Sequence, residues 1–390
     1  MKEMNKWEQI KLIISILLGI SVTVLSFFTL VGFLFSPQRI ILWVLLLIFY
    51  ISIISFLILW NRNLSIKKYI LLSISIICIL IFISIIAYTH YIYTIPSVNE
   101  TEINIYSYQP FNEKNQLAIL NVEANYKLDN NLPVLDGATA LYPVYASFVN
   151  AVYPIDKYDP RNSIVLCSKT IDAYNNLLEG KVDIIFCAAP SDEQTEQFNN
   201  NGINLVLTPI GKEAFVFFVN KKNTINDLSI EDIQNIYSGK IKNWKVFGGR
   251  NRNIKVYQRP DNSGSQTALI NIMGNKPIIK PLREEISDGM GRIINEVASY
   301  RNFNNAIGYS FLYFSTKMVQ NNQIKLLSIN NIYPSQITIQ NDTYPFSDSF
   351  FAIYVEKDDK NSNIKPFIEW ILSEQGQELI EKTGYIPITK

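Results

Sequence analysis

Histidine is the scarcest residue of this 390-residue chain, because its single copy, His90, lies near the end of a long apolar run. A histidine-based catalytic triad and a histidine zinc site are therefore excluded. The chain also lacks the clustered basic face that binds nucleic-acid backbones, since residues 96–390 hold 28 Lys+Arg against 32 Asp+Glu. We therefore expect no nucleic-acid partner, and any anion site has to be local.

Cysteine is scarce as well. Of the three cysteines, Cys78 lies in an apolar run, and Cys167 and Cys187 lie in strand-like segments further along the chain. A disulfide between the last two stays open, but two buried free thiols are favoured, because the two segments need not be neighbours in a sheet.

Charged residues are nearly missing from residues 1–95, which hold 7 Lys+Arg and 2 Asp+Glu. The apolar runs 12–35, 40–60 and 69–95 are each long enough to cross a hydrocarbon core of about 30 Å as a helix. No small-residue cleavage site follows the first run, so we expect an uncleaved anchor. Positive charges before the first run and between the second and third predict a cytoplasmic N-terminus and an extracellular domain after residue 95.

The remaining sequence divides into a polar lead and a folded domain. Residues 96–131 are rich in asparagine, and we expect there an extracellular stalk and leading strands. From residue 132, short apolar runs alternate with amphipathic stretches, which is typical of α/β proteins with a mostly parallel sheet. The predicted strands are 132–135, 163–167, 182–188, 214–220 and 254–258. The predicted helices are 142–152, 171–179, 230–237, 266–273, 290–300 and 365–382.

Three strand-to-helix junctions end in hydroxyl-bearing residues, represented by Thr139, Thr170 and Ser263. A helix N-terminus presents unpaired N–H groups and a positive dipole potential, and hydroxyls add hydrogen-bond donors. The third junction is the sharpest, because Arg259 precedes the small-residue run 263–265 and a guanidinium can pair with two oxyanion oxygens. The pattern indicates an anion site, although each hydroxyl taken alone is also explained as an ordinary N-cap.

These motifs, in this order, resemble those of the phosphate-binding members of the periplasmic solute-binding protein family. The likeness covers about residues 132–390 and depends on Gly137-Ala138-Thr139 with Pro143 beyond it, and on the stretches 170–190, 236–244 and 259–265. The resemblance implies two α/β lobes, joined by crossing segments, that enclose the anion when they close. We interpret Tyr237 and Trp244, within 236–244, as core and turn residues rather than ligand contacts.

The same resemblance implies a set of ligand contacts. From the first two junctions, it implies that the ligand is held by Thr139, by the amide of Ala140 and by Thr170. From the other lobe, it implies contacts by Arg259, Ser263, Gly264 and Ser265.

One position departs from the family pattern. Phosphate-binding members carry an aspartate in the turn after the Val-Asp-Ile strand, where it accepts a hydrogen bond from a protonated oxyanion, and here that position is Ala188. Glu213 and Asp261 are candidates for a substitute acceptor, and each is also explained as a solvated or capping carboxylate. Alternatively, the site binds a phosphorylated or other acidic small molecule whose organic group occupies the space left by Ala188.

We predict an α/β protein with a two-lobed type II periplasmic-binding-protein fold, preceded by three transmembrane helices within 1–95. The first lobe is expected at 132–210 and 308–390 and the second at 211–307, with crossings at 214–220 and 306–314. Because binding rests on neutral donors and one arginine, no cofactor and no metal are implied.

Three functions compete for this sequence. The first is a membrane-anchored extracellular protein that captures phosphate or a related oxyanion for an ABC-type transporter. The second is a membrane sensor or regulator of an anionic small molecule, because three helices exceed what tethering needs. The third, an enzyme, is disfavoured because the sequence has no evident nucleophile–base pair or clustered carboxylates.

Overall fold

The computed structural model describes residues 103–280, 290–298, 305–356 and 361–388. The chain divides into two compact units, Met1–Ile95 and Pro96–Lys390, and all the described residues belong to the second. The three membrane helices expected within 1–95 lie outside the described residues. Within the described ranges, no helix is both long enough and apolar enough to span a bilayer.

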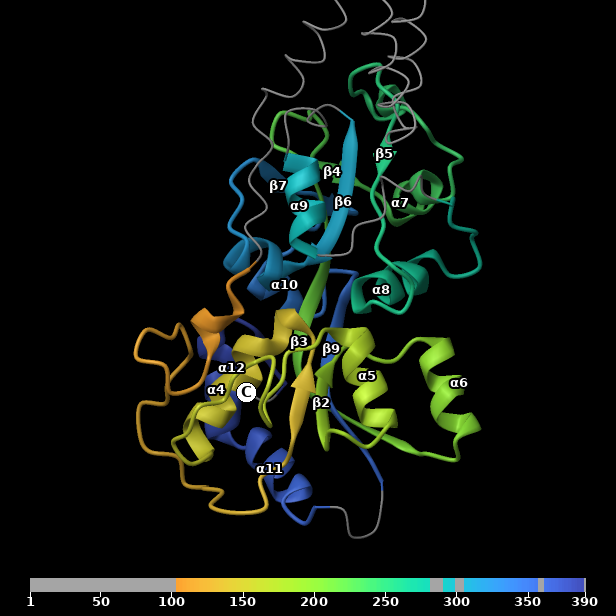
Figure 1. Cartoon of the computed structure of the whole chain (residues 1–390). Coiled ribbons are helices and arrows are strands. Elements are labelled where there is room, and N and C mark those ends of the chain that lie inside the picture. Colours follow the sequence, from red (N-terminus) through yellow and green to blue (C-terminus); the bar gives the residue numbers. More distant parts are fainter. Residues whose placement is uncertain (1–102, 281–289, 299–304, 357–360, 389–390) are drawn as a thin grey trace, which may run out of the picture. The chain divides into compact units, whose positions relative to one another are not determined.

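The elements alternate along the chain as Figure 1 shows. The helices and helical turns are η2 (Ile105–Tyr108), η3 (Thr139–Leu141), α4 (Tyr142–Val152), α5 (Thr170–Leu178), α6 (Asp192–Asn200), α7 (Ile230–Tyr237), η4 (Trp244–Phe247), α8 (Gly264–Met273), α9 (Met290–Ala298), η6 (Phe314–Met318), α10 (Gln336–Gln340), α11 (Ile364–Ile371) and α12 (Glu374–Thr383). The strands are β1 (Leu135–Gly137), β2 (Ile184–Cys187), β3 (Leu205–Asn220), β4 (Asp227–Leu228), β5 (Lys255–Val256), β6 (Ala306–Phe311), β7 (Ile324–Leu326), β8 (Ser328–Ile329), β9 (Ser347–Val355) and β10 (Ile386–Pro387).

The large sheet is mixed, in the order β1-β2-β9-β3-β6-β5, and β10 and β7 also pair with β3. Only the β1–β2 and β5–β6 pairs of this described sheet are parallel, so the expectation of a mostly parallel sheet was wrong. The physical reason is the length of β3. One half of it pairs antiparallel with β9 and the other half pairs antiparallel with β6 and β7.

The first core lies around β1, β2 and β9. Strand β2 is buried on both faces, and its alternate side chains enter two different clusters. Phe186 packs with α4, α11 and α12, and stacks on Tyr145 with ring centroids 4.9 Å apart. Ile185 and Cys187 pack instead with α5 and α6. Helices cover both faces, which explains why this strand is a continuous apolar run.

The second core lies around the end of β3, β6 and helices α7 and α8. Residues 214–219 of β3 are all buried, and Phe217 packs against Tyr237 and Tyr309 with ring centroids 5.8 and 6.2 Å apart. Leu327, Ile329 and Tyr344 belong to this core as well. Residues 326–346 therefore lie largely in the second core, whereas Tyr313, within the expected crossing 306–314, packs in the first. Strand β9 then pairs with both β2 and β3.

Residues 103–131 do not form the leading strands that we expected. This part of the described chain contains the turn η2 and otherwise irregular backbone. It lies on the first core, where Tyr108, Leu117 and Leu128 are buried. The amide of Phe111 donates to the Asn150 side chain of α4 at 2.9 Å, which fastens the segment to that helix.

Candidate functional site

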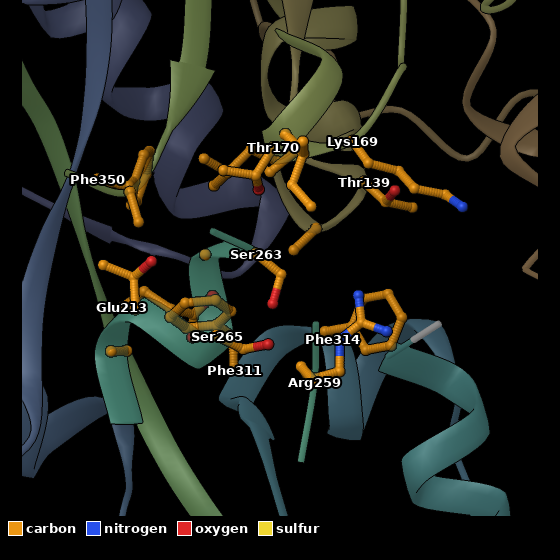
Figure 2. A pocket seen from close by; sticks show the side chains of 18 of the residues that line it. Thr139, Lys169, Thr170, Glu213, Arg259, Ser263, Ser265, Phe311, Phe314 and Phe350 are labelled. Atoms are coloured by element: carbon orange, nitrogen blue, oxygen red, sulfur yellow. The ribbon is translucent and has the colours of Figure 1, made fainter. Parts of the chain in front are cut away.

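A cavity of about 800 Å³ is lined by residues of all three predicted junctions. Its walls include nine of the ten candidate positions, which are Thr139, Ala140, Thr170, Ala188, Glu213, Arg259, Ser263, Gly264 and Ser265. Figure 2 shows Ser263 and Arg259 facing Thr139 and Thr170 across this space, with Glu213 and Phe350 to one side. Asp261, the remaining candidate, is not among the lining residues.

Asp136 joins the first two junctions, a role that sequence reasoning did not assign to it. Its carboxylate is fully buried and accepts from the amides of Gly137 at 2.7 Å and Ser168 at 2.9 Å. It also accepts from the Ser168 hydroxyl at 2.5 Å and the Asn176 side chain at 2.9 Å. A buried carboxylate is stable when its lone pairs are occupied in this way. The end of β1 and the start of α5 are thereby held together.

Helix α5 begins with no side-chain cap. Its N-cap residue is Lys169, whose φ of 77° and ψ of 166° are rarely adopted by residues other than glycine. Thr170 is the first helical residue, so the explanation of Thr170 as an N-cap is wrong. The N-cap of η3 is likewise Ala138 and not Thr139. No capping side chain therefore accepts a hydrogen bond from the first N–H groups of α5, and the start of this helix lines the cavity.

Helix α8 begins opposite α5. Ser263 is its N-cap and accepts from the amide of Gln266, so here the N-cap explanation is confirmed. A β-carbon added to Gly264 would stand 3.2 Å from the Thr170 hydroxyl oxygen and 3.8 Å from the Ala188 β-carbon. The two helix N-termini thus converge on one point, where their dipoles favour a negative charge.

The backbone of Arg259 is fixed by a buried network of polar side chains. Its amide donates to the Gln266 side chain at 3.0 Å and to the Tyr309 hydroxyl at 2.9 Å. Tyr309 and Gln266 are hydrogen-bonded to each other, and Gln266 donates to Gln258 at 3.2 Å. The start of the guanidinium side chain is therefore set by residues from β6 and α8, while the side chain lines the cavity.

Glu213 lies on β3, where this strand pairs with β9. Its Oε1 accepts from the amides of Tyr313 at 3.1 Å and Ala214 at 3.3 Å. Its Oε2 is buried and has no hydrogen-bond partner among the described residues. The Tyr385 hydroxyl lies beside Glu213 and donates to the carbonyl of Ala140 at 2.5 Å. Burial raises the pKa of Glu213 to about 8, although the amides of Tyr313, Ala214 and Leu312 and the Tyr385 hydroxyl oppose this shift.

The charges around the cavity favour an anion. The basic residues of its described lining are Arg161, Lys169, Arg259 and Arg292, and the acidic ones are Asp172, Glu213 and Asp348. Because its pKa is raised, Glu213 is largely neutral at pH 7. No group of three or more side chains suited to a metal ion lies together in the described part of the chain.

The two cysteines of this domain are free and buried, as the sequence favoured. Burial raises the pKa of Cys167 to about 12 and that of Cys187 further. A thiol that stays protonated is a weak nucleophile. Cys167 lines the cavity but is therefore a packing residue there.

This architecture defines a class of protein: an α/β chain with a mixed sheet, two cores, and a cavity edged by helix N-termini, hydroxyls and an arginine. A family model described as a PBP superfamily domain matches residues 134–375. The chain belongs to that superfamily.

Curated relatives carry one common name. Phosphate-binding protein PstS of Borreliella burgdorferi is 26% identical over 189 residues, which cover 46% of this chain and 65% of that protein. Phosphate-binding protein PstS of Bacillus subtilis is 28% identical over 174 residues, which cover 44% of this chain and 54% of the relative. The chain thus matches less than two thirds of the length of either relative.

The solved structures contain the same fold. The phosphate-bound structure of a substrate-binding protein assigned to a phosphate ABC transporter of Clostridium perfringens aligns with a TM-score of 0.50 and 25% identity. The alignment covers 68% of this chain and 100% of that one. The PBP fold predicted from the sequence is therefore confirmed for the described domain.

Proposed function

We propose that this chain is a solute-binding protein that captures phosphate or a related oxyanion and passes it to an ABC-type transporter. The ligand would be held by the residues of the three junctions: Thr139, Ala140, Thr170, Arg259, Ser263, Gly264 and Ser265. The observation that carries the proposal is the meeting of the α5 and α8 N-termini, with Thr170 3.2 Å from the β-carbon position of Gly264. Two positive dipole ends and an arginine at one cavity stabilise an anion without a metal.

The proposal extends to how the domain works. The two cores act as lobes, and their relative motion about β3 and β9 opens and closes the cavity. The apolar sequence of residues 1–95 anchors the domain to the membrane with the binding lobes outside. The protein is not an enzyme, because its site offers hydrogen-bond donors rather than a nucleophile with a base. The names of the relatives, which are phosphate-binding proteins, support the same proposal.

Calorimetric titration of the purified full chain with phosphate and with sulfate tests the binding step. We expect phosphate to bind, and Arg259→Ala to weaken binding by at least about tenfold, because a charge-assisted contact contributes about 1.5–3 kcal/mol. Arg252→Ala is the matched control, since Arg252 is exposed and is not among the lining residues. Absence of binding for both anions, or equal loss in both variants, would contradict the proposed site.

The sensor alternative makes a different prediction about cells. If the chain delivers phosphate, deleting the gene for this chain lowers the initial rate of labelled phosphate uptake. Expression of the wild-type chain restores that rate, and expression of Arg259→Ala does not. A regulator without a transport role would leave the initial uptake rate unchanged when transporter levels are held constant.

A further inference from the structure

The cavity is much larger than the anion that its polar wall would hold. Its volume is about 800 Å³, whereas a phosphate ion displaces roughly the volume of three waters, on the order of 100 Å³. Cavities of about 300–1,000 Å³ are the size that proteins use for small organic ligands. Most of this space therefore lies beyond the reach of a bare phosphate at the helix N-termini.

The cavity has this volume even though hydrogen bonds already connect the two cores. The Ser191 hydroxyl donates to the side-chain oxygen of Asn262 at 2.8 Å, and the Asn262 amide donates to Glu193 at 2.7 Å. Ser191 and Glu193 belong to the start of α6 in the first core, whereas Asn262 precedes α8 in the second. The Thr170 hydroxyl oxygen lies 3.2 Å from the position of a β-carbon on Gly264. The space is thus not simply that of two separated halves.

The wall of the cavity that β3, β6 and β9 form is aromatic. Phe215 and Phe311 are cross-strand neighbours on β3 and β6, with ring centroids 5.8 Å apart. Phe350 on β9 also lines the cavity, and Figure 2 shows it on the same side as Glu213, with Phe311 beside Ser265. Phe215 and Phe350 are nearly buried already, whereas Phe311 is partly exposed. Covering Phe311 with an apolar group gains free energy, and a hydrated inorganic anion gains nothing there.

Glu213 is the polar group at this aromatic side. Its carboxyl is largely neutral at pH 7, because burial raises its pKa to about 8. Its Oε2 has no hydrogen-bond partner in the described part of the chain. Because Oε1 accepts from two amides, the proton of the neutral carboxyl lies on Oε2. An unpartnered buried O–H costs about 1–3 kcal/mol, and a ligand hydroxyl that accepts from it would remove that cost.

The polar wall suits an anion without a proton of its own. Inorganic phosphate keeps an O–H at neutral pH, but the residue beside Gly264 is Ala188, whose methyl group offers no carboxylate for it, so only weaker hydroxyl acceptors such as Thr170 are left at this point. A phosphate monoester loses its last proton with a pKa near 6, so at pH 7.5 it presents only acceptor oxygens to the hydroxyls and amides.

We infer that the ligand is a phosphate monoester with a small organic body. Its phosphate group lies between the N-termini of α5 and α8, and its body lies against Phe311 and Phe350 with a hydroxyl directed to Glu213. This inference rests on the proposed function, because it places the phosphate group in the same site.

Calorimetric titration of the full chain at pH 7.5 with inorganic phosphate, glycerol 3-phosphate and phenyl phosphate tests it. We expect at least one of the two esters to bind at least about tenfold more tightly than inorganic phosphate, which corresponds to about 1.4 kcal/mol. Phe311→Ala should weaken that ester at least about fivefold and change inorganic phosphate less than twofold. Ser265→Ala should weaken both. Phe311→Leu, which keeps an apolar side chain, should retain more of the ester affinity and guards against misfolding.

The outcomes separate the two proposals. If inorganic phosphate binds as tightly as both esters or more tightly, the monoester inference is overturned and the phosphate-binding function stands. If none of the three compounds binds, the proposed function fails and the inference fails with it. Equal loss of ester and phosphate binding in Phe311→Ala would also overturn the inference, because the aromatic side would then not contact an organic group.

Discussion

The hydroxyl oxygen of Thr170 lies 3.2 Å from the position that a β-carbon on Gly264 would occupy. These residues begin α5 and α8, which belong to different cores. The approach is closer than most real β-carbon contacts, so glycine at 264 lets the two helix N-termini meet. The site that we propose depends on this close approach.

Replacing Gly264 by alanine should therefore not raise the free energy of unfolding, as this change usually does in a helix. Gly291, near the start of α9, would place a β-carbon 4.0 Å from Val319, an ordinary contact. We expect Gly291→Ala to raise the free energy of unfolding by about 0.5–1 kcal/mol and Gly264→Ala to leave it unchanged or lower. Denaturant titration of both variants measures this. An equal gain in the two would mean that Thr170 does not restrict position 264.

Ser263 has two roles, and a matched serine separates them. Ser263 caps α8 and Ser229 caps α7, each by accepting from a backbone amide three residues on. Ser263→Ala and Ser229→Ala should each cost about 1 kcal/mol of stability. Of the two, Ser263→Ala should also weaken phosphate binding, by about fivefold or more, because Ser263 lines the cavity. Unfolding curves and calorimetry on both variants check this, and equal effects on binding would argue against Ser263 as a contact.

The Asn262 bridge between the cores should stabilise their contact. Asn262 and Asn331 both have left-handed backbones, with φ of 61° and 64°, so glycine fits equally well at either position. Asn262→Gly also removes the hydrogen bonds with Ser191 and Glu193. We expect it to be about 1–2 kcal/mol less stable than Asn331→Gly in denaturant unfolding. Matching stabilities would show that the bridge contributes nothing measurable.

Glu213 should make the protein less stable as the pH rises. Its pKa is raised from about 4.5 to about 8 in the folded state, so between these values the unfolded chain loses the proton while the folded chain keeps it. The free energy of unfolding then falls by up to about 1.4 kcal/mol per pH unit over that window and levels off outside it. Glu213→Gln should remove this slope. Unfolding measured from pH 5 to pH 8.5 checks the prediction, and parallel curves for both proteins would refute it.

Local sequence predicted the helices well. The expected bounds 142–152 and 230–237 agree with α4 and α7, because an apolar periodicity and a turn-forming start are both local signals. The expected helix 365–382 is instead two helices, α11 and α12. Ser373 is the N-cap of the second, and its hydroxyl donates to the Trp370 carbonyl at 2.6 Å, which occupies the end of the first.

Strands that cross between the cores were harder to predict. The first half of β3 contains Pro209 and Gly211, and the register with β9 shifts between these residues. Proline and glycine indicate a break in sequence analysis, but a bulge accommodates both within one continuous strand. Strand β9 was missed altogether, and with it the antiparallel centre of the sheet.

The sequence by itself predicted an anion site, because three hydroxyl-bearing junctions and an arginine are local features whose chemistry does not depend on distant contacts. Tertiary structure alone decided how the site is assembled. It brought Thr170 close to Gly264, placed Asp136 at the joint of two junctions, and put Glu213 beside an aromatic wall with its Oε2 buried. Burial and close approach depend on residues far apart in the chain, so no local pattern encodes the raised pKa or the size of the cavity.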